Sequence, residues 1–481
     1  MPGDITPFST ATEMLRALEA REISSQELTE LHIDRIEQHN APLNAIVVET
    51  FDRAREAARH ADEERQHNGA GALLGLPMTL KESTLTAGLP QSAGLKDFAE
   101  YRPSTDGPLA RAVFDAGACL LGKTNIPVAL GDWQSDSPVY GRTNNPWDTS
   151  RTPGGSTGGG GAALAAGLTP LEVGSDIGGS IRVPAAYCGV YGHKPSETAI
   201  PQSGAFPLAD LPNPAALMGV QGPLARSAED LETLFWVLSG PDVGEDTAWQ
   251  LLLPPARATT FEELRVAVLP AQGDIPVAGE LQGRVDELAS LLAQRGATVA
   301  ETPLPFDRDD YFYDYIRLLH AMTTVGSPRD VRERQAADLR KRGDRLGEAM
   351  AEGRTMDVPA FSQLLKRREE ARELWRGFFR DWDVMLAPMT LDAAFPHQDA
   401  PFMERVLNVD GQEVPYIWNI FYPMLALFAG QPSTAFPAGR NGAGLPLGLQ
   451  VIGPYLEDRT TLEFAKMVER EWYAFEAPPG Y

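Results

Sequence analysis

Two serines in glycine-rich surroundings constrain the fold of this chain more than any other feature. Six of the eight residues from 154 to 161 are glycine, and they surround Ser156. An Ala-rich segment and a short apolar run follow, and Ser180 then comes after a second pair of glycines. Glycine adopts backbone angles that other residues avoid, and successive N–H groups in such a turn can converge on an anion. Tight packing of a helix on a strand is the alternative explanation for either serine alone.

Short apolar runs along the chain predict the fold class. Runs such as residues 118–121 and 171–173 are continuous rather than alternating, which is typical of strands buried on both faces. Helical segments alternate with them, so we expect an α/β fold with a mixed, centrally buried β-sheet covered by helices on both faces. Further strands are expected at residues 45–48, 264–269, 297–304, 384–386 and 449–452.

The chain is expected to form one structural unit with two helical regions. Residues 1–70 form an N-terminal helical segment, because Thr10-x-x-Glu13 and Ser24-x-x-Glu27 are capping boxes. Residues 71–481 form the main domain, with a core at about 71–260 and a charged helical insertion at about 309–382. Residues 195–260 are rich in Pro and Gly, and we interpret them as surface loops broken by one helix near Ser227.

The acidic composition excludes some classes of partner. The chain has 42 Lys and Arg against 66 Asp and Glu, a formal net charge of −24. Such a surface repels phosphate, so no nucleic-acid partner is expected.

The N-terminus lacks the layout of a signal peptide, and the apolar stretch at 418–429 is too short to span a membrane. The two cysteines allow no disulfide framework and no zinc site of their own, and we expect a cytoplasmic protein.

One literal motif match, at residues 117–124, fails in its context. The segment fits the phosphate-loop pattern G-x-x-x-x-G-K-[ST]. That loop needs a strand before it and a helix after it. Here a helical pattern precedes the segment and Asn125-Ile-Pro127 follows it. We therefore interpret the segment as a buried strand ending in a turn, with nucleotide binding as the non-enzymatic alternative.

A second literal match, at residues 154–158, fits the nucleophile elbow G-x-S-x-G of Ser-His-Asp hydrolases. The elbow needs a buried strand upstream, but residues 148–153 are polar and contain Pro153. It also needs a histidine, for which only His193 and His397 lie in predicted loops. A Ser-His-Asp hydrolase remains the mechanistic alternative.

Three further motifs stand in the chain: Gly75-Leu-Pro-Met-Thr-Leu-Lys81, Gly154-Gly-Ser-Thr-Gly-Gly159 and Asp176-Ile-Gly-Gly-Ser-Ile-Arg-Val-Pro184. Together they closely resemble the amidase signature family, whose members hydrolyse C–N bonds with a Ser-Ser-Lys triad. Residues 122–125, 145–147 and 444–453 also match, so the resemblance covers about residues 10–470. Thr157, Glu82 and Val128 depart from the family pattern, where a second serine, an Asp and a Glu or Gln are commoner.

The resemblance implies roles for the residues of these motifs. Ser180 would be the nucleophile, Ser156 the bridging serine after a cis peptide bond, and Lys81 the base. A lysine with its ordinary pKa of about 10.4 is protonated at neutral pH, so this role requires burial that lowers the pKa. Asp176 and Arg182 would support the loop that carries the nucleophile. The oxyanion hole would be formed by the backbone N–H groups of Ile177, Gly178, Gly179 and Ser180.

The implied activity is hydrolysis of a small-molecule carboxylic amide, with no metal and no cofactor. Leu130 and Trp133 are candidate pocket residues, as are the aromatic residues at 311–315 and 418–422, although such residues more often fill a core. If any of them faces the cleft, an apolar or aryl amide, anilide or carbamate is expected, and esters offer the same carbonyl. The alternative within the family is the amide-hydrolysing subunit of a tRNA-dependent amidotransferase. A homodimer is left open.

Overall fold

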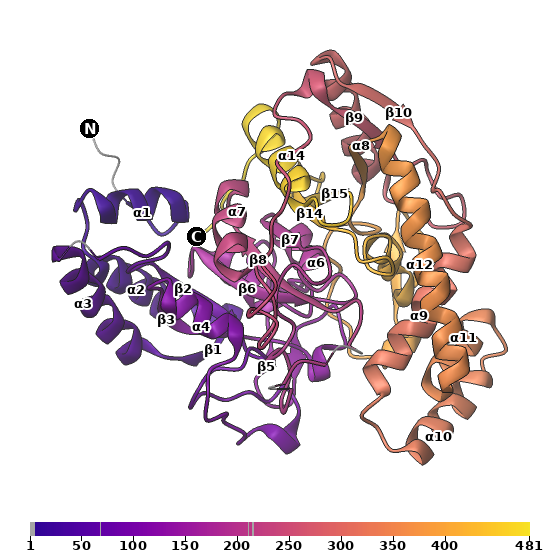
Figure 1. Cartoon of the computed structure of the whole chain (residues 1–481), viewed down its shortest axis with the longest axis horizontal. Coiled ribbons are helices and arrows are strands. Elements are labelled where there is room, and N and C mark those ends of the chain that lie inside the picture. Colours follow the sequence, from indigo (N-terminus) through magenta and orange to yellow (C-terminus); the bar gives the residue numbers. More distant parts are fainter. Residues whose placement is uncertain (1–4, 68, 210, 214–215) are drawn as a thin grey trace.

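One long mixed sheet runs through the centre of the molecule in a computed structural model (Figure 1), which describes residues 5–67, 69–209, 211–213 and 216–481. Its eleven strands lie in the order β1-β3-β2-β6-β8-β7-β14-β15-β11-β9-β10. They are β1 (Ile46–Glu49), β2 (Pro77–Lys81), β3 (Cys119–Thr124), β6 (Leu171–Asp176), β7 (Tyr191–Lys194), β8 (Val220–Ala225), β9 (Arg265–Val268), β10 (Thr298–Glu301), β11 (Val384–Pro388), β14 (Ser433–Arg440) and β15 (Pro446–Ile452).

The sheet contains both parallel and antiparallel pairs, as the sequence predicts. Strands β3, β2 and β6 run parallel to one another, and so do β11, β9 and β10. The pairs that lie between these two groups are antiparallel. Two small hairpins lie outside the sheet, β4 (Asp136–Ser137) with β5 (Gly141–Arg142) and β12 (Val406–Val409) with β13 (Gln412–Pro415).

Helices connect the parallel strands and flank the sheet. Parallel neighbours need a crossover connection, and α4 supplies it between β2 and β3, as α8 does between β9 and β10. The helices are α1 (Ala11–Glu19), α2 (Ser25–Leu43), α3 (Phe51–Gln66), α4 (Pro108–Asp115), α5 (Gly158–Ala165), α6 (Arg182–Cys188), α7 (Ala228–Leu238), α8 (Gly279–Gln294), α9 (Arg308–Thr324), α10 (Arg329–Arg340), α11 (Arg345–Thr355), α12 (Val358–Asp381), α13 (Phe421–Met424) and α14 (Asp458–Glu471).

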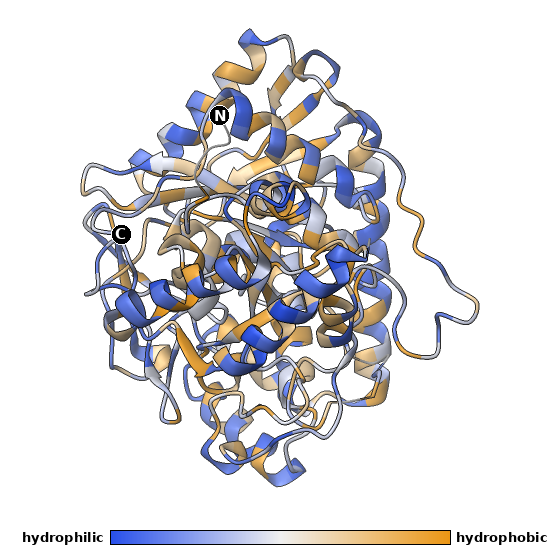
Figure 2. Cartoon of the chain, turned by 90° about the vertical axis from the view of Figure 1, so that its left-hand side faces the viewer, coloured by the Kyte–Doolittle hydropathy of each residue, from blue (hydrophilic) through white to orange (hydrophobic). Residues whose placement is uncertain are grey.

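The two predicted helical regions lie at opposite ends of the sheet. Helices α1 to α3 gather beside β1, β2 and β3, and α9 to α12 gather at the other side of the molecule (Figure 1). Both predicted capping boxes are present, at Thr10 and Ser24. Hydrophobic residues concentrate on the inner elements, and hydrophilic residues dominate the outer helices (Figure 2). No helix in the described part of the chain is long and apolar enough to cross a membrane.

The strand at residues 119–124 decides between the two interpretations of this segment, a buried strand or a phosphate loop. Every residue of β3 is buried, and the strand pairs with β1 on one side and β2 on the other. A phosphate loop needs exposed, helix-capping backbone N–H groups, and this segment has none to offer because its backbone belongs to the sheet. The structural interpretation of residues 117–124 is therefore confirmed.

The interpretation of residues 195–260 as loops broken by one helix is wrong in one place. Residues 220–225 form β8, a fully buried strand between β6 and β7. Gly222 and Pro223 conceal the strand in the sequence, because both residues are depleted in strands. Pro223 is tolerated here because β7 pairs only with Leu224 and Ala225, so the missing N–H is not needed on that side.

Candidate active site

Two parallel strands bring the predicted site residues to one edge of the sheet. Lys81 is the last residue of β2, and Asp176 is the last residue of β6. The strands are direct neighbours, with Thr79 opposite Glu172. Ligand and catalytic sites in open α/β sheets form at the carboxyl ends of parallel strands. The Gly-rich turn before α5 reaches the same edge, because Lys81 contacts Ser156 and Thr157 of that turn.

Lys81 is buried, and within the described residues its Nζ atom forms hydrogen bonds with hydroxyl groups alone. Burial lowers the pKa of Lys81 to about 7, against the opposing charges of Asp176, Glu172 and Glu82. A large fraction of the side chain is therefore a neutral amine at neutral pH. Its Nζ atom lies 2.7 Å from Ser156 Oγ, 3.0 Å from Thr157 Oγ1 and 2.9 Å from Ser175 Oγ.

The turn that carries Ser156 admits only glycine at its first positions. A Cβ atom on Gly155 would lie 2.3 Å from the Asp132 carbonyl oxygen, and one on Gly154 would lie 2.8 Å from the backbone of Pro184. Gly154 also has a φ of 89°, a backbone angle that favours glycine. The Gly155–Ser156 peptide bond is cis, as the resemblance implies.

Ser180 lies in a buried turn between β6 and α6. The Thr157 N–H donates to the Ser180 carbonyl oxygen at 3.1 Å, so the two serine-bearing turns are joined through their backbones. The Asp176 carboxylate accepts the N–H groups of Gly179 at 2.8 Å and Ile181 at 3.2 Å. The Gly179 N–H is thus used inside the turn, which differs from the expectation that it faces a substrate oxygen.

Arg182 ties this turn to the C-terminal strands. Its guanidinium pairs with the Asp176 carboxylate at 3.0 Å, with both side chains fully buried. It also donates to Gln450 Oε1 at 2.8 Å and to the Pro423 carbonyl oxygen at 3.0 Å. Although burial alone acts to raise it, the Arg182 charge and hydrogen bonds leave the pKa of Asp176 below its usual value. The motif at residues 444–453 therefore reaches the site through Gln450.

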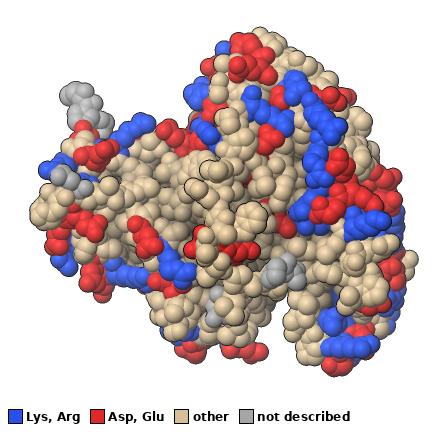
Figure 3. All heavy atoms as spheres, viewed as in Figure 1, with Lys and Arg blue, Asp and Glu red and all other residues tan. Residues whose placement is uncertain are grey.

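An apolar cavity of about 380 Å³ lies beside the turn. Ile177 forms part of its wall, and the opposite walls come from α9, α11 and the start of α12. Figure 3 shows the surface indented near α10, which carries one further lining residue, Arg332. Its apolar side chains are those of Ile177, Ala216, Leu217, Ala321, Met322, Val325, Met356, Val358 and Phe361.

The two pocket candidates from the sequence do not line this cavity. Trp133 is buried, and its indole Nε1 donates to the Gly178 carbonyl oxygen at 2.9 Å, so it contacts the turn that carries Ser180 directly. Leu130 is half-buried, with a φ of 58°, in the short helical turn Val128–Leu130. Of the aromatic candidates, Tyr315 reaches the site and donates to the Ile177 carbonyl oxygen at 2.8 Å. Phe312 instead stacks on Trp418.

The histidines of the Ser-His-Asp alternative lie elsewhere. His193 is buried on β7 and contacts Thr434 and Asp458. The Nε2 atom of His397 lies 3.1 Å from Asn144 Oδ1. Within the described ranges, no histidine hydrogen-bonds to Ser156 or Ser180, and no three His, Cys, Asp or Glu side chains form a group that could hold a metal ion.

Two of the three residues that depart from the family pattern, Thr157 and Glu82, belong to a polar network around the site. Thr157 supplies the hydroxyl that accepts from Lys81. The buried Glu82 carboxylate accepts from the Ser92 hydroxyl at 2.8 Å and from Tyr140 Oη at 2.8 Å. Val128 is exposed and takes no part in this network.

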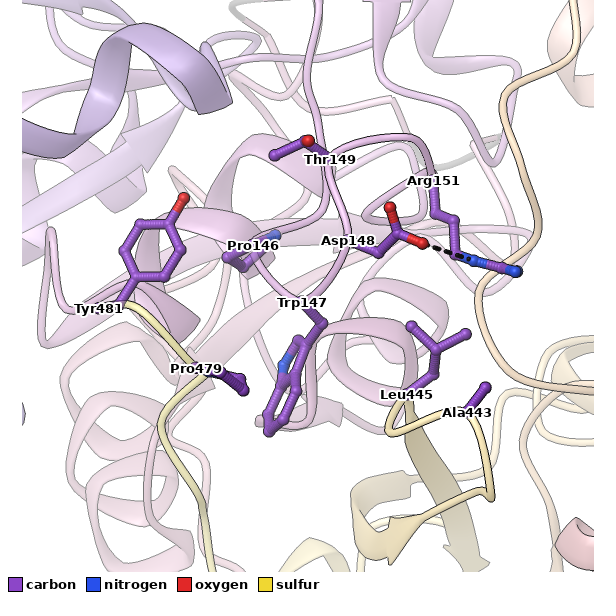
Figure 4. A pocket seen from close by; sticks show the side chains of 9 residues that line it. All are labelled: Pro146, Trp147, Asp148, Thr149, Arg151, Ala443, Leu445, Pro479 and Tyr481. Carbon is purple, nitrogen blue, oxygen red and sulfur yellow. Dashed lines mark hydrogen bonds and ion pairs between the residues drawn. The ribbon is translucent and has the colours of Figure 1, made fainter.

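The matching residues 145–147 have a structural role at the far end of α6. Trp147 Nε1 donates to the Cys188 carbonyl oxygen at 3.0 Å, and Asn145 Nδ2 donates to that of Tyr187 at 2.9 Å. Trp147 also lines an open cavity of about 450 Å³ (Figure 4), where Asp148 and Arg151 form an ion pair. This cavity contains none of the predicted site residues.

Comparison with known proteins identifies the family. A family model described as Amidase matches residues 27–462. The chain belongs to the amidase signature family. Its members are hydrolases of amide C–N bonds, and this chain is one of them.

Relatives of this amidase cover nearly its whole length. Indoleacetamide hydrolase of Bradyrhizobium diazoefficiens is 32% identical over 467 residues, which cover 96% of this chain and 86% of that protein. A glutamyl-tRNA(Gln) amidotransferase subunit of a Synechococcus strain is 29% identical over 501 residues, which cover 98% of each. The structure of a bacterial aryl acylamidase of the amidase signature family superposes with a TM-score of 0.81 at 26% identity, covering 98% of this chain and 99% of the other.

Two polar residues of the site were not predicted from the sequence. Ser175 directly precedes the third motif, and its hydroxyl contacts Lys81. Glu172 is a buried carboxylate on β6 that belongs to none of the motifs and accepts from the hydroxyls of Thr79 and Thr124. One feature of the sequence could have indicated Glu172: it is a charged residue inside a run, residues 171–173, that is predicted to be buried on both faces.

Proposed function

We propose that this amidase hydrolyses neutral, apolar or aryl carboxylic amides with Ser180 as nucleophile, Ser156 as bridging residue and Lys81 as base. The observation that carries the proposal is the buried Lys81 amine, with a pKa of about 7, at 2.7 Å from Ser156 Oγ. A general base works best with a pKa near the operating pH. A hydroxyl suits the bridging position because it both donates and accepts.

Acylation follows from this arrangement. The Ser180 hydroxyl gives its proton to Ser156 Oγ, which passes its own proton to neutral Lys81. Ser180 Oγ bonds to the substrate carbonyl carbon, and the carbonyl oxygen becomes an oxyanion. The C–N bond then breaks as the Lys81 ammonium returns a proton through Ser156 to the leaving nitrogen. An amine leaves, and an acyl ester remains on Ser180.

Deacylation repeats the relay with water. Water gives one proton through Ser156 to Lys81 and adds to the ester carbonyl, and Ser180 Oγ then departs and recovers a proton. The carboxylic acid leaves, and the enzyme is restored. The N–H groups of Ile177, Gly178 and Ser180 are the oxyanion donors in this proposal, since the Gly179 N–H is used by the Asp176 carboxylate. Such donors typically contribute about 3–4 kcal/mol each.

The cavity beside Ile177 supports the apolar part of the substrate class. Its lining is dominated by aliphatic, Met and Phe side chains, and its volume of about 380 Å³ lies in the lower part of the range for ligand pockets. An aryl or branched alkyl group attached to the scissile carbonyl fits this space better than a charged group, because burying an unpaired charge is costly. Carbamates and esters present the same carbonyl to Ser180.

Substitutions on a neutral anilide substrate test the proposal. Ser180→Ala and Lys81→Met are expected to lower kcat by at least about 1000-fold, because residues of one proton relay act as a unit and the loss of either one disables it. Lys123→Met is the matched control, since Lys123 is also a buried lysine, on neighbouring β3, and donates to the Pro90 carbonyl oxygen. It is expected to retain activity. Full activity of either Ser180→Ala or Lys81→Met would contradict the proposal.

A second candidate function is the amide-hydrolysing subunit of a tRNA-dependent amidotransferase. The similarity to the Synechococcus amidotransferase subunit over 98% of both chains favours it. In that case glutamine hydrolysis would appear only after partner subunits are added, and neutral anilides would not be hydrolysed by the chain alone.

A further inference from the structure

The turn at residues 177–180, which carries Ser180, is called the nucleophile turn below. Each of its carbonyl oxygens accepts a hydrogen bond from outside its own peptide. Those of Gly179 and Ser180 accept from the backbone N–H groups of Val183 at 2.7 Å and Thr157 at 3.1 Å. Those of Ile177 and Gly178 accept instead from two aromatic side chains, Tyr315 Oη at 2.8 Å and Trp133 Nε1 at 2.9 Å. The orientation of every peptide plane in the turn is therefore fixed from its carbonyl side.

The carbonyl of one residue fixes the N–H of the next. A trans peptide is planar, and its C=O and N–H point in opposite directions. The bond from Tyr315 to the Ile177 carbonyl thus directs the Gly178 N–H away from α9. In the same way, the Val183 N–H directs the Ser180 N–H, and Trp133 directs the Gly179 N–H toward Asp176.

The peptide between residues 177 and 178 depends most on such a bond. Gly178 has no side chain to restrict its rotation, and it is half-exposed at the site. The Ser180 N–H, another donor, is fixed by the bond from the Val183 N–H to the Gly179 carbonyl oxygen, in the first turn of α6. Among the described residues, the Tyr315 hydroxyl is the one group seen to donate to the carbonyl oxygen of this peptide.

Tyr315 is suited to this task. The side chain is fully buried on α9, and burial, with the charge of Asp176, raises the pKa of Tyr315 well above its usual value. The hydroxyl is thus a neutral, permanent donor. Residues 321–323 of the same helix line the apolar cavity, so one helix supports both the substrate wall and the donor peptide.

We propose that Tyr315 is a positioning residue that orients the Gly178 N–H toward the oxyanion. The inference rests on the proposed function, and it assigns a role in catalysis to the helical region that carries none of the three motifs. Because an oxyanion donor acts only if it is held in place before the reaction, loss of the hydroxyl lowers the rate of the chemical step rather than substrate binding.

Two tyrosine-to-phenylalanine variants test it. Tyr315→Phe removes the hydroxyl at the Ile177 carbonyl. Tyr311→Phe is the matched control, because Tyr311 is buried one turn earlier on α9 and donates to the Leu425 carbonyl oxygen at 2.9 Å. With a neutral anilide, Tyr315→Phe is expected to lower kcat by about 10- to 100-fold with KM within about twofold, below the loss for a direct donor. Tyr311→Phe is expected to keep kcat within about twofold.

A trifluoromethyl ketone that forms a hemiketal oxyanion on Ser180 supplies the second readout. Its affinity is expected to fall with Tyr315→Phe by the same factor as kcat, and to stay unchanged with Tyr311→Phe. Unchanged kcat and inhibitor affinity in Tyr315→Phe would overturn the proposal, as would equal losses in both variants. Such results leave the proposed function intact as long as Ser180→Ala is inactive. An active Ser180→Ala enzyme would overturn the proposed function itself.

Discussion

At the scale of single residues, the chemistry depends on how far burial lowers the pKa of one amine. Three carboxylates, Asp176, Glu172 and Glu82, act against the desolvation of Lys81. Arg182 already neutralises Asp176. Among the described residues, Glu172 has no such cationic partner in hydrogen-bond contact, and its two oxygens accept from threonine hydroxyls. The negative charge of Glu172 therefore acts to raise the pKa of Lys81 without a neighbouring cation to offset it.

The first prediction concerns pH. Because the neutral form of Lys81 is the base, kcat/KM is expected to rise through a pH of about 7 and then level off. Burial raises the pKa of Glu172 to about 7, and its ionised form raises the pKa of Lys81. Glu172→Gln removes that charge and keeps the side-chain size, so the half-maximal rate is expected at a lower pH. Stopped assays of anilide hydrolysis from pH 5 to about 9 measure the shift.

Glu469→Gln is the control for this prediction. Burial also raises the pKa of Glu469 to about 7, but its carboxylate accepts from the Ala228 N–H, on α7. The pH profile of Glu469→Gln is expected to match that of the unmodified enzyme. A profile that does not change with pH, or equal shifts in both variants, would contradict the role given to Lys81.

At the scale of elements, close packing of α5 on the sheet brings the site together. A Cβ atom on Gly159 would lie 2.2 Å from the Asn125 backbone nitrogen, and one on Gly160 would lie 2.5 Å from Glu172 Cγ. The glycines of α5 therefore have two structural effects. They let the helix approach the strands, and they leave room for a buried carboxylate behind Lys81.

Gly159→Ala is expected to destabilise the protein by about 3 kcal/mol, because backbone atoms must move to admit the methyl group. Gly377→Ala, in the C-terminal part of α12, is the opposite case. No described atom outside the backbone of its own helix lies within 4 Å of its added Cβ, so the variant is expected to gain about 0.5–1 kcal/mol from helix propensity. Urea unfolding followed by circular dichroism measures both. Equal stability of the two variants would refute this explanation of the glycine-rich turn.

The sequence predicted elements best where local signals agree. Capping boxes placed the starts of α1 and α2, and continuous apolar runs placed β3, β9 and β11. Strand β8 was missed because Gly222 and Pro223 are tolerated only by the particular pairing of its neighbours. Tyr315 was recognised only as part of an aromatic stripe, since its contact with Ile177 spans 138 residues and no local pattern specifies it.

At the scale of the whole molecule, charge and apolar surface are divided between regions. Charged side chains gather over the outer helices, whereas a broad area over the sheet carries few charges on the face shown in Figure 3. The net charge of −24 repels anions at low ionic strength. Neutral substrates do not experience this barrier.

Ionic strength therefore separates two substrate classes. For an anilide with a carboxylate on its ring, kcat/KM is expected to rise at least about threefold between 20 mM and 500 mM NaCl, because salt screens the repulsion. The uncharged methyl ester of the same anilide is the matched control, and its kcat/KM for amide cleavage is expected to stay constant. Equal responses of the two substrates would show that the acidic surface has no influence on selection.

The most direct test of the relay is to label the enzyme with a fluorophosphonate and map the modified peptide by mass spectrometry. The reagent bonds covalently to an activated serine and to few others. We predict a single tag on Ser180, formed faster as the pH rises through about 7 and lost in Lys81→Met. A tag on Ser156 or on another serine, or labelling of Ser180 at an undiminished rate in Lys81→Met, would contradict the account.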